Sequence, residues 1–378
     1  MKTKTHRNEI NAEKSPTFFC EICRAIYYCS DECRIASTSG RNGDHDRNAC
    51  MRLAEEVILF EQLVKKTEGG AEDELLGVQK SACIELKRLG VHKHHDYRRE
   101  CSCFDFVPFG ELVYNELHSV STYEEYVAPE LQYFRKLLRE INDGDAPDGD
   151  APAADWVQKH ARVDHLPFSI AQNILKFNLD VIMESSVLRV YIAGCEKEFD
   201  TFERVAKKIY ALTSRDDEDD DSTTRRMEVY FVGPELSKRL HNTVVSFYDG
   251  NLQCILLKGL LGTSAELEGG AQPDIVYCPN AGVAIYTHEW HAAVRWCILN
   301  AKGRKAGCLM LFSDFTFEAA WKGYELLLQW IVEQGAEGRT ILPVCENAWK
   351  HPTLRKHERV TTKQVREYSN GFIFGFGT

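Results

Sequence analysis

The chain has 378 residues, of which 44% are hydrophobic and 27% are charged, and its formal net charge is −11 at pH 7. These fractions are ordinary for a soluble globular protein, and the length predicts two or three domains. The negative charge argues against a general nucleic-acid-binding surface, and no apolar run approaches the length of a membrane span. Fourteen cysteines without a secretory leader favour a reducing compartment, so we expect a cytoplasmic protein, with mitochondrion and nucleus as alternatives.

The segment at 18–53 is crowded with potential metal ligands. It contains five of the fourteen cysteines and one histidine, namely Cys20, Cys23, Cys29, Cys33, His45 and Cys50. So short a polar segment cannot bury a core of its own, and zinc is the ion that such side chains most often bind. Cys20 and Cys23 form a Cys-x-x-Cys knuckle, whose two thiolates reach one tetrahedral ion. The alternative, a set of reduced core or redox cysteines, does not usually come with a histidine in a polar loop.

This segment resembles a MYND zinc finger. The residues that carry the resemblance are Cys20-x-x-Cys23, then Tyr28-Cys29-Ser30-x-x-Cys33, then His45 and Cys50. The resemblance implies two interleaved zinc sites, the first made of Cys20, Cys23, His45 and Cys50, and the second including Cys29 and Cys33. Zinc sites closed by four protein ligands are structural, so the ion would order a docking surface rather than catalyse a reaction.

The second of these zinc sites lacks a ligand pair, because the opening Cys-x-x-Cys of the family is absent here. His6 and Glu9 stand at about its place and are chemically acceptable zinc ligands. Alternatively, the second site is empty, or the start of the chain is missing. The His45–Cys50 spacing is one residue longer than the family's usual one, which makes Asp46 a reserve ligand. We therefore expect one zinc ion and leave the second open.

Residues 54–155 are expected to form a helical connecting region. Apolar residues recur at helical spacing over 53–64 and again over 72–89, and an aromatic-rich helical stretch follows at 104–141. Between the last two lies a run with three histidines and two cysteines. No two of them have the spacing of a metal site, so an exposed loop is the favoured interpretation. The Pro-, Gly- and Asp-rich segment 142–155 predicts a linker.

The remainder, 156–378, begins with a helical stretch at 156–179 and then alternates strands with helices. The expected strands are 188–193, 228–232, 243–248, 253–257, 275–278, 308–312, 341–344 and 372–376, and the expected helices are 199–212, 288–299 and 318–333. Strands that are apolar on consecutive positions predict a mostly parallel sheet covered on both faces. The predicted architecture is therefore α+β overall, with a zinc-stabilised finger (1–53), a helical connecting region (54–155) and a three-layer, Rossmann-like α/β domain (156–378).

The C-terminal half is similar to the C-terminal domain of the mitochondrial splicing suppressor and translational activator family. The similarity lies in the runs 188–194, 229–236, 273–276 and 312–316, together with Glu198, Asn280, Gly282 and Glu318. A finger and such a domain in one chain imply a regulatory protein of gene expression or translation. In this interpretation, which we favour, the finger docks a short peptide of a protein partner.

The alternative is a methyltransferase-like α/β domain that binds S-adenosylmethionine or senses such a cofactor. Polar or turn residues follow or end the predicted strands at Gly194, Glu235, Asn280, Asp314 and Asn347, and ligands bind outside the carboxyl ends of strands in open α/β sheets. This layout resembles that of S-adenosylmethionine-dependent methyltransferases. Only one glycine follows the first strand, however, and no acid is obviously placed for a ribose diol. We therefore favour turn residues that close strands, predict no catalytic residue, and leave the enzyme question open with a preference for no.

Overall fold

The computed structural model describes residues 18–20, 22–23, 27–28, 35, 47–67, 108–109, 154–177, 187–213, 226–263, 271–301, 307–335, 341–351 and 367–378. The chain divides into two compact units, Met1–Leu76 with Arg355–Glu367, and Gly77–Leu354 with Tyr368–Thr378. We call them the N-terminal unit and the α/β unit. The predicted helix at 72–89 and the linker at 142–155 lie outside the described residues, as does nearly all of 104–141. The predicted domain boundaries stay predictions.

The described residues of the N-terminal unit include a short hairpin and a long helix. Strands β1 (Phe18–Phe19) and β2 (Tyr27–Tyr28) pair antiparallel, and helix α2 runs over Arg47–Thr67. The helix expected at 53–64 is thus confirmed, but it begins earlier. Cys50 therefore lies inside α2, where its spacing from Leu53 and Val57 brings all three onto one buried face beside Cys23.

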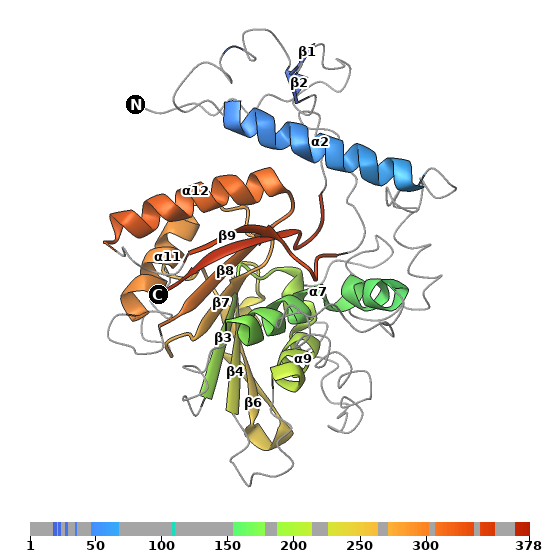
Figure 1. The fold of residues 1–378 in the computed structure, drawn as a ribbon. Coiled ribbons are helices and arrows are strands. Elements are labelled where there is room, and N and C mark those ends of the chain that lie inside the picture. The colour runs from blue at the N-terminus through green and yellow to red at the C-terminus, as the bar shows by residue number, and fades with distance from the viewer. Residues whose placement is uncertain are drawn as a thin grey trace. The chain divides into compact units, whose positions relative to one another are not determined.

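The α/β unit is built on an eight-stranded sheet in the order β5-β6-β4-β3-β7-β8-β10-β9 (Figure 1). Its strands are β3 (Val187–Ala193), β4 (Arg226–Gly233), β5 (Thr243–Phe247), β6 (Leu252–Lys258), β7 (Ile275–Cys278), β8 (Leu309–Asp314), β9 (Ile341–Glu346) and β10 (Phe372–Gly377). Strands β6, β4, β3, β7 and β8 are parallel to one another, whereas β5 and β10 run antiparallel to their neighbours. All eight predicted strands are confirmed within two residues at each end, as is the mostly parallel sheet.

Helices cover both faces of this sheet. Helices α7 (Ala154–Lys176) and α9 (Phe202–Thr213) pack on one face, and α11 (Thr287–Ala301) and α12 (Phe317–Glu333) pack on the other. The helix predicted at 199–212 is divided into a 3₁₀ turn, Lys197–Asp200, and α9, because Thr201 between them leaves the helical conformation. In the described part of the chain no helix is both long and apolar enough to cross a membrane.

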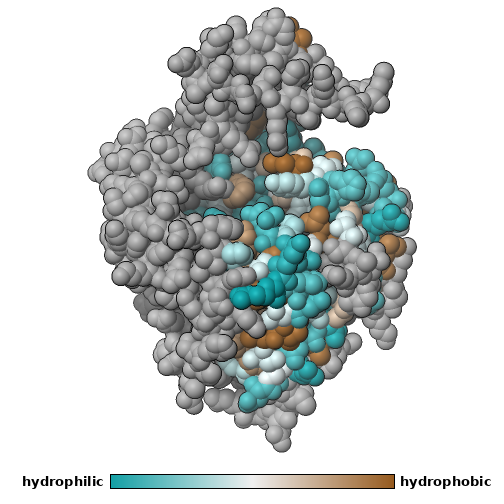
Figure 2. Space-filling model, turned by 180° about the vertical axis from the view of Figure 1, so that it is seen from behind, coloured by the Kyte–Doolittle hydropathy of each residue, from teal (hydrophilic) through white to brown (hydrophobic). Residues whose placement is uncertain are grey.

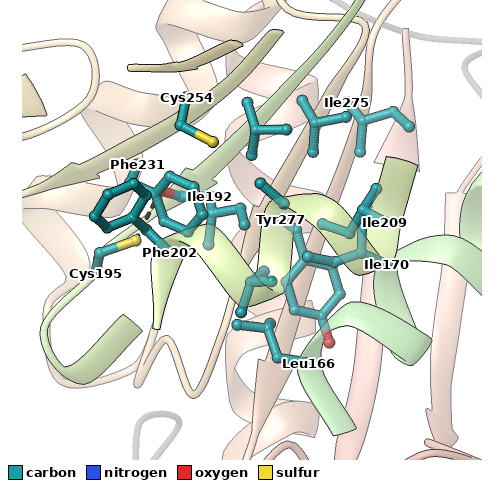
Figure 3. Packing of buried hydrophobic residues seen from close by; sticks show 14 of the residues in the cluster. Leu166, Ile170, Ile192, Cys195, Phe202, Ile209, Phe231, Cys254, Ile275 and Tyr277 are labelled. Atoms are coloured by element: carbon teal, nitrogen blue, oxygen red, sulfur yellow. Dashed lines mark hydrogen bonds between the residues drawn. The ribbon is translucent and has the colours of Figure 1, made fainter. Parts of the chain in front are cut away.

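The central strands are apolar at consecutive positions because both faces of the sheet are buried, one of them against α7 and α9. Along β3, Val190 and Ile192 belong to the core against α7 and α9, whereas Tyr191 belongs to the core on the opposite face. In Figure 3 the ring of Phe202 from α9 lies against that of Phe231 from β4, with ring centroids 6.0 Å apart. A strand buried on both faces has no solvent side to keep polar, so alternation is lost.

The end of β4 approaches the loop after β3 so closely that only glycine fits there. A Cβ on Gly233 would lie 2.0 Å from the backbone oxygen of Cys195. We expect Gly233→Ala to lower the free energy of unfolding of the α/β unit by about 2 kcal/mol or more, since the backbone must shift. Gly335→Ala is the control, because its Cβ would meet nothing within 4 Å and only its left-handed backbone adds a cost of about 1 kcal/mol. Urea unfolding measures both, and equal losses would contradict the close approach.

Candidate functional site

The order of the parallel strands reverses between β3 and β7. From β3 the chain moves outward to β4 and β6, and then returns to the other side of β3 with β7 and β8. This is the 3-2-1-4-5 order of doubly wound folds, in which ligands bind outside the carboxyl ends of the strands at the reversal. We call the residues that follow these strand ends, 194–198 after β3, 233–236 after β4 and 279–286 after β7, the switch edge.

Gly194 opens the loop after β3 at the switch edge. It is exposed and has φ +81°, a conformation that glycine adopts without steric cost. A Cβ at this position would meet the ring of Trp290 at 3.1 Å. Trp290 comes from α11 and is held in place because its Nε1–H donates to the backbone oxygen of Ala281 at 2.7 Å. The outer side of Gly194 is therefore open, while its inner side rests on an indole ring.

Three glutamates belong to the same part of the switch edge, Glu196 and Glu198 in the loop after β3 and Glu235 after β4. Glu196 and Glu235 are exposed, whereas Glu198 is half-buried and its Oε2 accepts a hydrogen bond of 2.9 Å from the N–H of Glu196. Burial raises the pKa of the Glu198 carboxyl group above its usual value, against the hydrogen bonds from backbone N–H groups that lower it.

Glu235 was predicted from the sequence as a strand-end residue, but not as a candidate acid for a ribose. It follows the end of β4, the strand that pairs with β3. In dinucleotide-binding folds an acid about 20 residues beyond the glycine turn binds the ribose hydroxyls. Here Glu235 comes about 40 residues after Gly194, because the acidic segment at 214–225 lengthens the connection. The sequence therefore identified Glu235 as a strand-end residue. Its long separation from Gly194 in the sequence is the reason that it was not recognised as a possible ribose-binding acid.

Asn280, just after β7 at the switch edge, is held by hydrogen bonds within the protein. The N–H of Asn280 donates to Ser313 Oγ at 2.9 Å, and its Nδ2 donates to Ser369 Oγ at 3.2 Å. Its Oδ1 accepts from the N–H of Asn370 at 2.6 Å. Both ends of the Asn280 side chain thus bind the protein itself, which fits the interpretation of Asn280 as a residue that closes its strand.

A buried polar network lies behind Asn280 and ties α7 to the strand ends. The hydroxyl of Tyr277 donates to Asn370 Oδ1 at 2.5 Å, and Asn370 Nδ2 donates to Ser169 Oγ of α7 at 2.8 Å. Asn347 Nδ2 donates to the same Ser169 Oγ at 2.9 Å and to the backbone oxygen of Asn370 at 2.8 Å. Burial raises the pKa of Tyr277 well above its usual value, so its hydroxyl keeps the proton it donates. Figure 3 shows the Tyr277 ring reaching from the sheet towards α7.

The five predicted strand-end residues therefore fall into two groups. Asn280, Asp314 and Asn347 are half-buried or buried, and Asp314 Oδ1 accepts from the N–H of Phe315 at 2.8 Å. Gly194 and Glu235 are exposed. The switch edge is therefore accessible at Gly194 and Glu235 on the β3–β4 side, and also at Ile285 and Tyr286 in the loop after β7, which are 65% and 57% exposed.

The N-terminal unit holds a second candidate site, a cluster of three cysteines. The Sγ atoms of Cys20, Cys23 and Cys50 all lie within 4.8 Å of one another, and those of Cys20 and Cys50 are 3.5 Å apart. This separation is well beyond a disulfide bond of about 2 Å. It is close to the edge of about 3.8 Å that follows from a tetrahedron with Zn–S bonds of about 2.3 Å. The donor set and its spacing fit a zinc ion.

The pKa values of Cys20 and Cys50 in the cluster are shifted in opposite directions. Burial acts to raise the pKa of Cys20, but hydrogen bonds from the backbone N–H groups of Cys23 and Ile22 help to lower it below its usual value. Burial and the hydrogen bond with Cys20 raise the pKa of Cys50 to about 12. A divalent cation among the three sulfurs would favour the thiolate at each of them.

Of the six predicted metal ligands, the structure thus brings three together. Cys29, Cys33 and His45 lie outside the described residues, as do the reserve ligands His6, Glu9 and Asp46. The fourth ligand of the first site and the whole of the second site remain predictions.

Comparisons with known proteins give little further guidance. A scan against models of protein families finds none that matches the chain, and a search of curated proteins finds no relative. Among solved structures, the chain is similar to a candidate class I S-adenosylmethionine-dependent methyltransferase from Listeria monocytogenes, with a TM-score of 0.31 and 10% identity over 87% of this chain and 81% of the other. A likeness at this TM-score carries no argument about fold or function.

Proposed function

We propose that the α/β unit binds a nucleoside-type small molecule at the switch edge, with S-adenosylmethionine as the first candidate. The observation that carries the proposal is the reversal of strand order between β3 and β7, with Gly194 and Glu235 exposed beside it. A glycine lets a ligand approach the backbone closely, and a carboxylate can accept hydrogen bonds from both hydroxyls of a ribose.

The charges at the switch edge favour a cationic ligand over a dinucleotide. Glu196, Glu198 and Glu235 would repel a pyrophosphate, and they outnumber the cations beside them, which are Lys197 and Lys258, whose Nζ donates to the backbone oxygens of Pro234 and Leu236. The loop after β3 also lacks the additional glycines of a pyrophosphate-binding turn. S-adenosylmethionine has a ribose, a sulfonium and an amino group, and no phosphate. It therefore suits this set of side chains better than a nicotinamide dinucleotide does.

We expect Glu235→Gln to weaken binding of S-adenosylmethionine by about tenfold or more, since a hydrogen bond to a charged group contributes about 1.5–3 kcal/mol. Isothermal titration calorimetry on the full chain measures the effect. Glu325→Gln is the matched control: Glu325 is exposed on α12, its Oε1 accepts from Trp321 Nε1 at 2.8 Å, and glutamine can still accept that bond. The control should bind like the wild type.

The same titration decides the proposal itself. Binding of S-adenosylmethionine or S-adenosylhomocysteine, with weaker binding of a nicotinamide dinucleotide, supports it. Absence of binding to either ligand at high micromolar concentration overturns it, and so does binding that Glu235→Gln leaves unchanged.

A second function is favoured by the three converging sulfurs in the N-terminal unit. Here Cys20, Cys23 and Cys50 hold a structural zinc ion, and His45 is the expected fourth ligand. The zinc-ordered unit then docks a short peptide of a protein partner, as the MYND resemblance implies. Metal analysis of the purified chain tests the zinc site: one ion per chain supports it, two would bring His6 and Glu9 into the second site, and none would refute it.

A further inference from the structure

Strand β5 forms one outer edge of the sheet. It pairs antiparallel with β6 over its whole length, and no other strand in the described part of the chain pairs with it. In an antiparallel pair, alternate residues point their N–H and C=O groups away from the partner strand. β5 therefore presents backbone hydrogen-bonding groups on its outer side, and Val244 within it is 55% exposed.

The two edges of the sheet differ in how they discourage pairing with another chain. At the far edge, β9 contains Pro343, which lacks an N–H, and ends at Glu346, whose Oε1 lies 2.6 Å from Lys350 Nζ. Proline and charge are the usual means by which edge strands avoid further pairing. β5 reads Thr-Val-Val-Ser-Phe, with no proline, no charge and three β-branched residues. Such a strand is a template for another strand.

The charges on either side of β5 favour a second copy of the chain as the partner, paired in the antiparallel orientation. Exposed Lys238 and Arg239 precede the strand, and exposed Asp249 follows it. If two β5 strands pair antiparallel about a two-fold axis through the middle of the strand, the beginning of each lies beside the end of the other. The basic turn of one copy then lies beside Asp249 of the second copy, and the contact occurs twice. Parallel pairing would instead bring like charges together.

We propose that two copies of this chain associate through β5, antiparallel, and so form one continuous sheet across a two-fold axis. The contact is isologous, which is the commonest symmetry among homo-oligomers. Among the coloured residues in Figure 2, hydrophobic side chains stand in small groups between hydrophilic ones.

The first experiment is sedimentation velocity on the full chain over a range of concentrations. We expect the wild type to dimerise and Val244→Lys to raise the dimer dissociation constant by at least tenfold, because a charged side chain at the edge opposes pairing. Val332→Lys is the matched control: Val332 is 62% exposed on α12, and its replacement should leave dimerisation unchanged. Circular dichroism checks that each variant is folded. A wild type that stays monomeric at every concentration, or a dimer that Val244→Lys does not weaken, overturns the proposal.

A second pair of variants leaves the strand itself untouched and tests the orientation. Reversing the basic turn, with Lys238→Glu and Arg239→Glu together, should weaken the dimer at least tenfold. Adding Asp249→Lys should restore it, because the charges again complement one another across the axis. If the double variant does not weaken the dimer, or if the triple variant does not restore it, antiparallel pairing through β5 is overturned. If Val244→Lys folds poorly, these charge variants still test whether two copies pair through β5.

Discussion

Cys23→Ser is expected to release the metal and unfold the N-terminal unit, while the α/β unit keeps its fold. Among the described residues of this unit, the buried apolar cluster is Cys23, Cys50, Leu53 and Val57, with Cys23 only 1% exposed. In a zinc site of this kind the free energy of zinc binding, about 10 kcal/mol or more for structural sites, becomes folding free energy. Metal analysis should show zinc lost, and hydrogen exchange should show protection lost in α2 but retained in β3.

Cys345→Ser is the matched control for this variant. Cys345 is an exposed cysteine on β9 of the α/β unit, so its replacement removes a thiol without touching the cluster. Zinc content and exchange in α2 should stay at wild-type values. Chelation of the wild type should reproduce the effect of Cys23→Ser and abolish capture of a docking partner. A Cys23→Ser protein that keeps both its zinc and its protected α2 would contradict the zinc site.

The sheet of the α/β unit was largely predictable as a set of strands, but its order was not. Apolar runs such as 188–193 and 275–278 identify buried strands because both of their faces lie against helices. The order of the strands depends on pairings between distant segments. Nothing in residues 372–376 indicates that β10 inserts antiparallel between β8 and β9, since a strand's neighbours are set by tertiary packing.

The candidate sites were predictable in part, for similar reasons. The Cys-x-x-Cys knuckle is local, and it indicated Cys20 and Cys23 directly. Helix α2 was expected to begin after Cys50, yet it begins at Arg47 and carries that cysteine to the other two. At the switch edge, Gly194 and Glu235 are recognisable as strand ends. The contact between Gly194 and Trp290 joins residues far apart in the sequence and has no local signal.

Asn370→Ala is expected to lower the free energy of unfolding of the α/β unit by about 3 kcal/mol or more. Asn370 is fully buried with φ +57°, and its side chain accepts from Tyr277 and donates to Ser169. Alanine removes the acceptor of the Tyr277 hydroxyl, and a buried hydroxyl left without a hydrogen-bond partner costs about 1–3 kcal/mol. Alanine also adds about 1–2 kcal/mol for the left-handed backbone. Urea unfolding measures the total as a shift in midpoint at constant slope.

Two further variants separate these contributions. Asn370→Gly removes the same hydrogen bonds but adopts the left-handed backbone freely, so it should be more stable than Asn370→Ala by about 1 kcal/mol. Asn300→Ala removes a half-buried asparagine of α11 whose Nδ2 donates to the Trp296 backbone oxygen at 2.9 Å, and it should cost less than about 1 kcal/mol. Equal losses for Asn370→Ala and Asn300→Ala would mean that the network adds nothing beyond an ordinary hydrogen bond. A larger loss for Asn370→Ala would show that the turns after β7 and β9 and before β10 hold one another in place through Asn370.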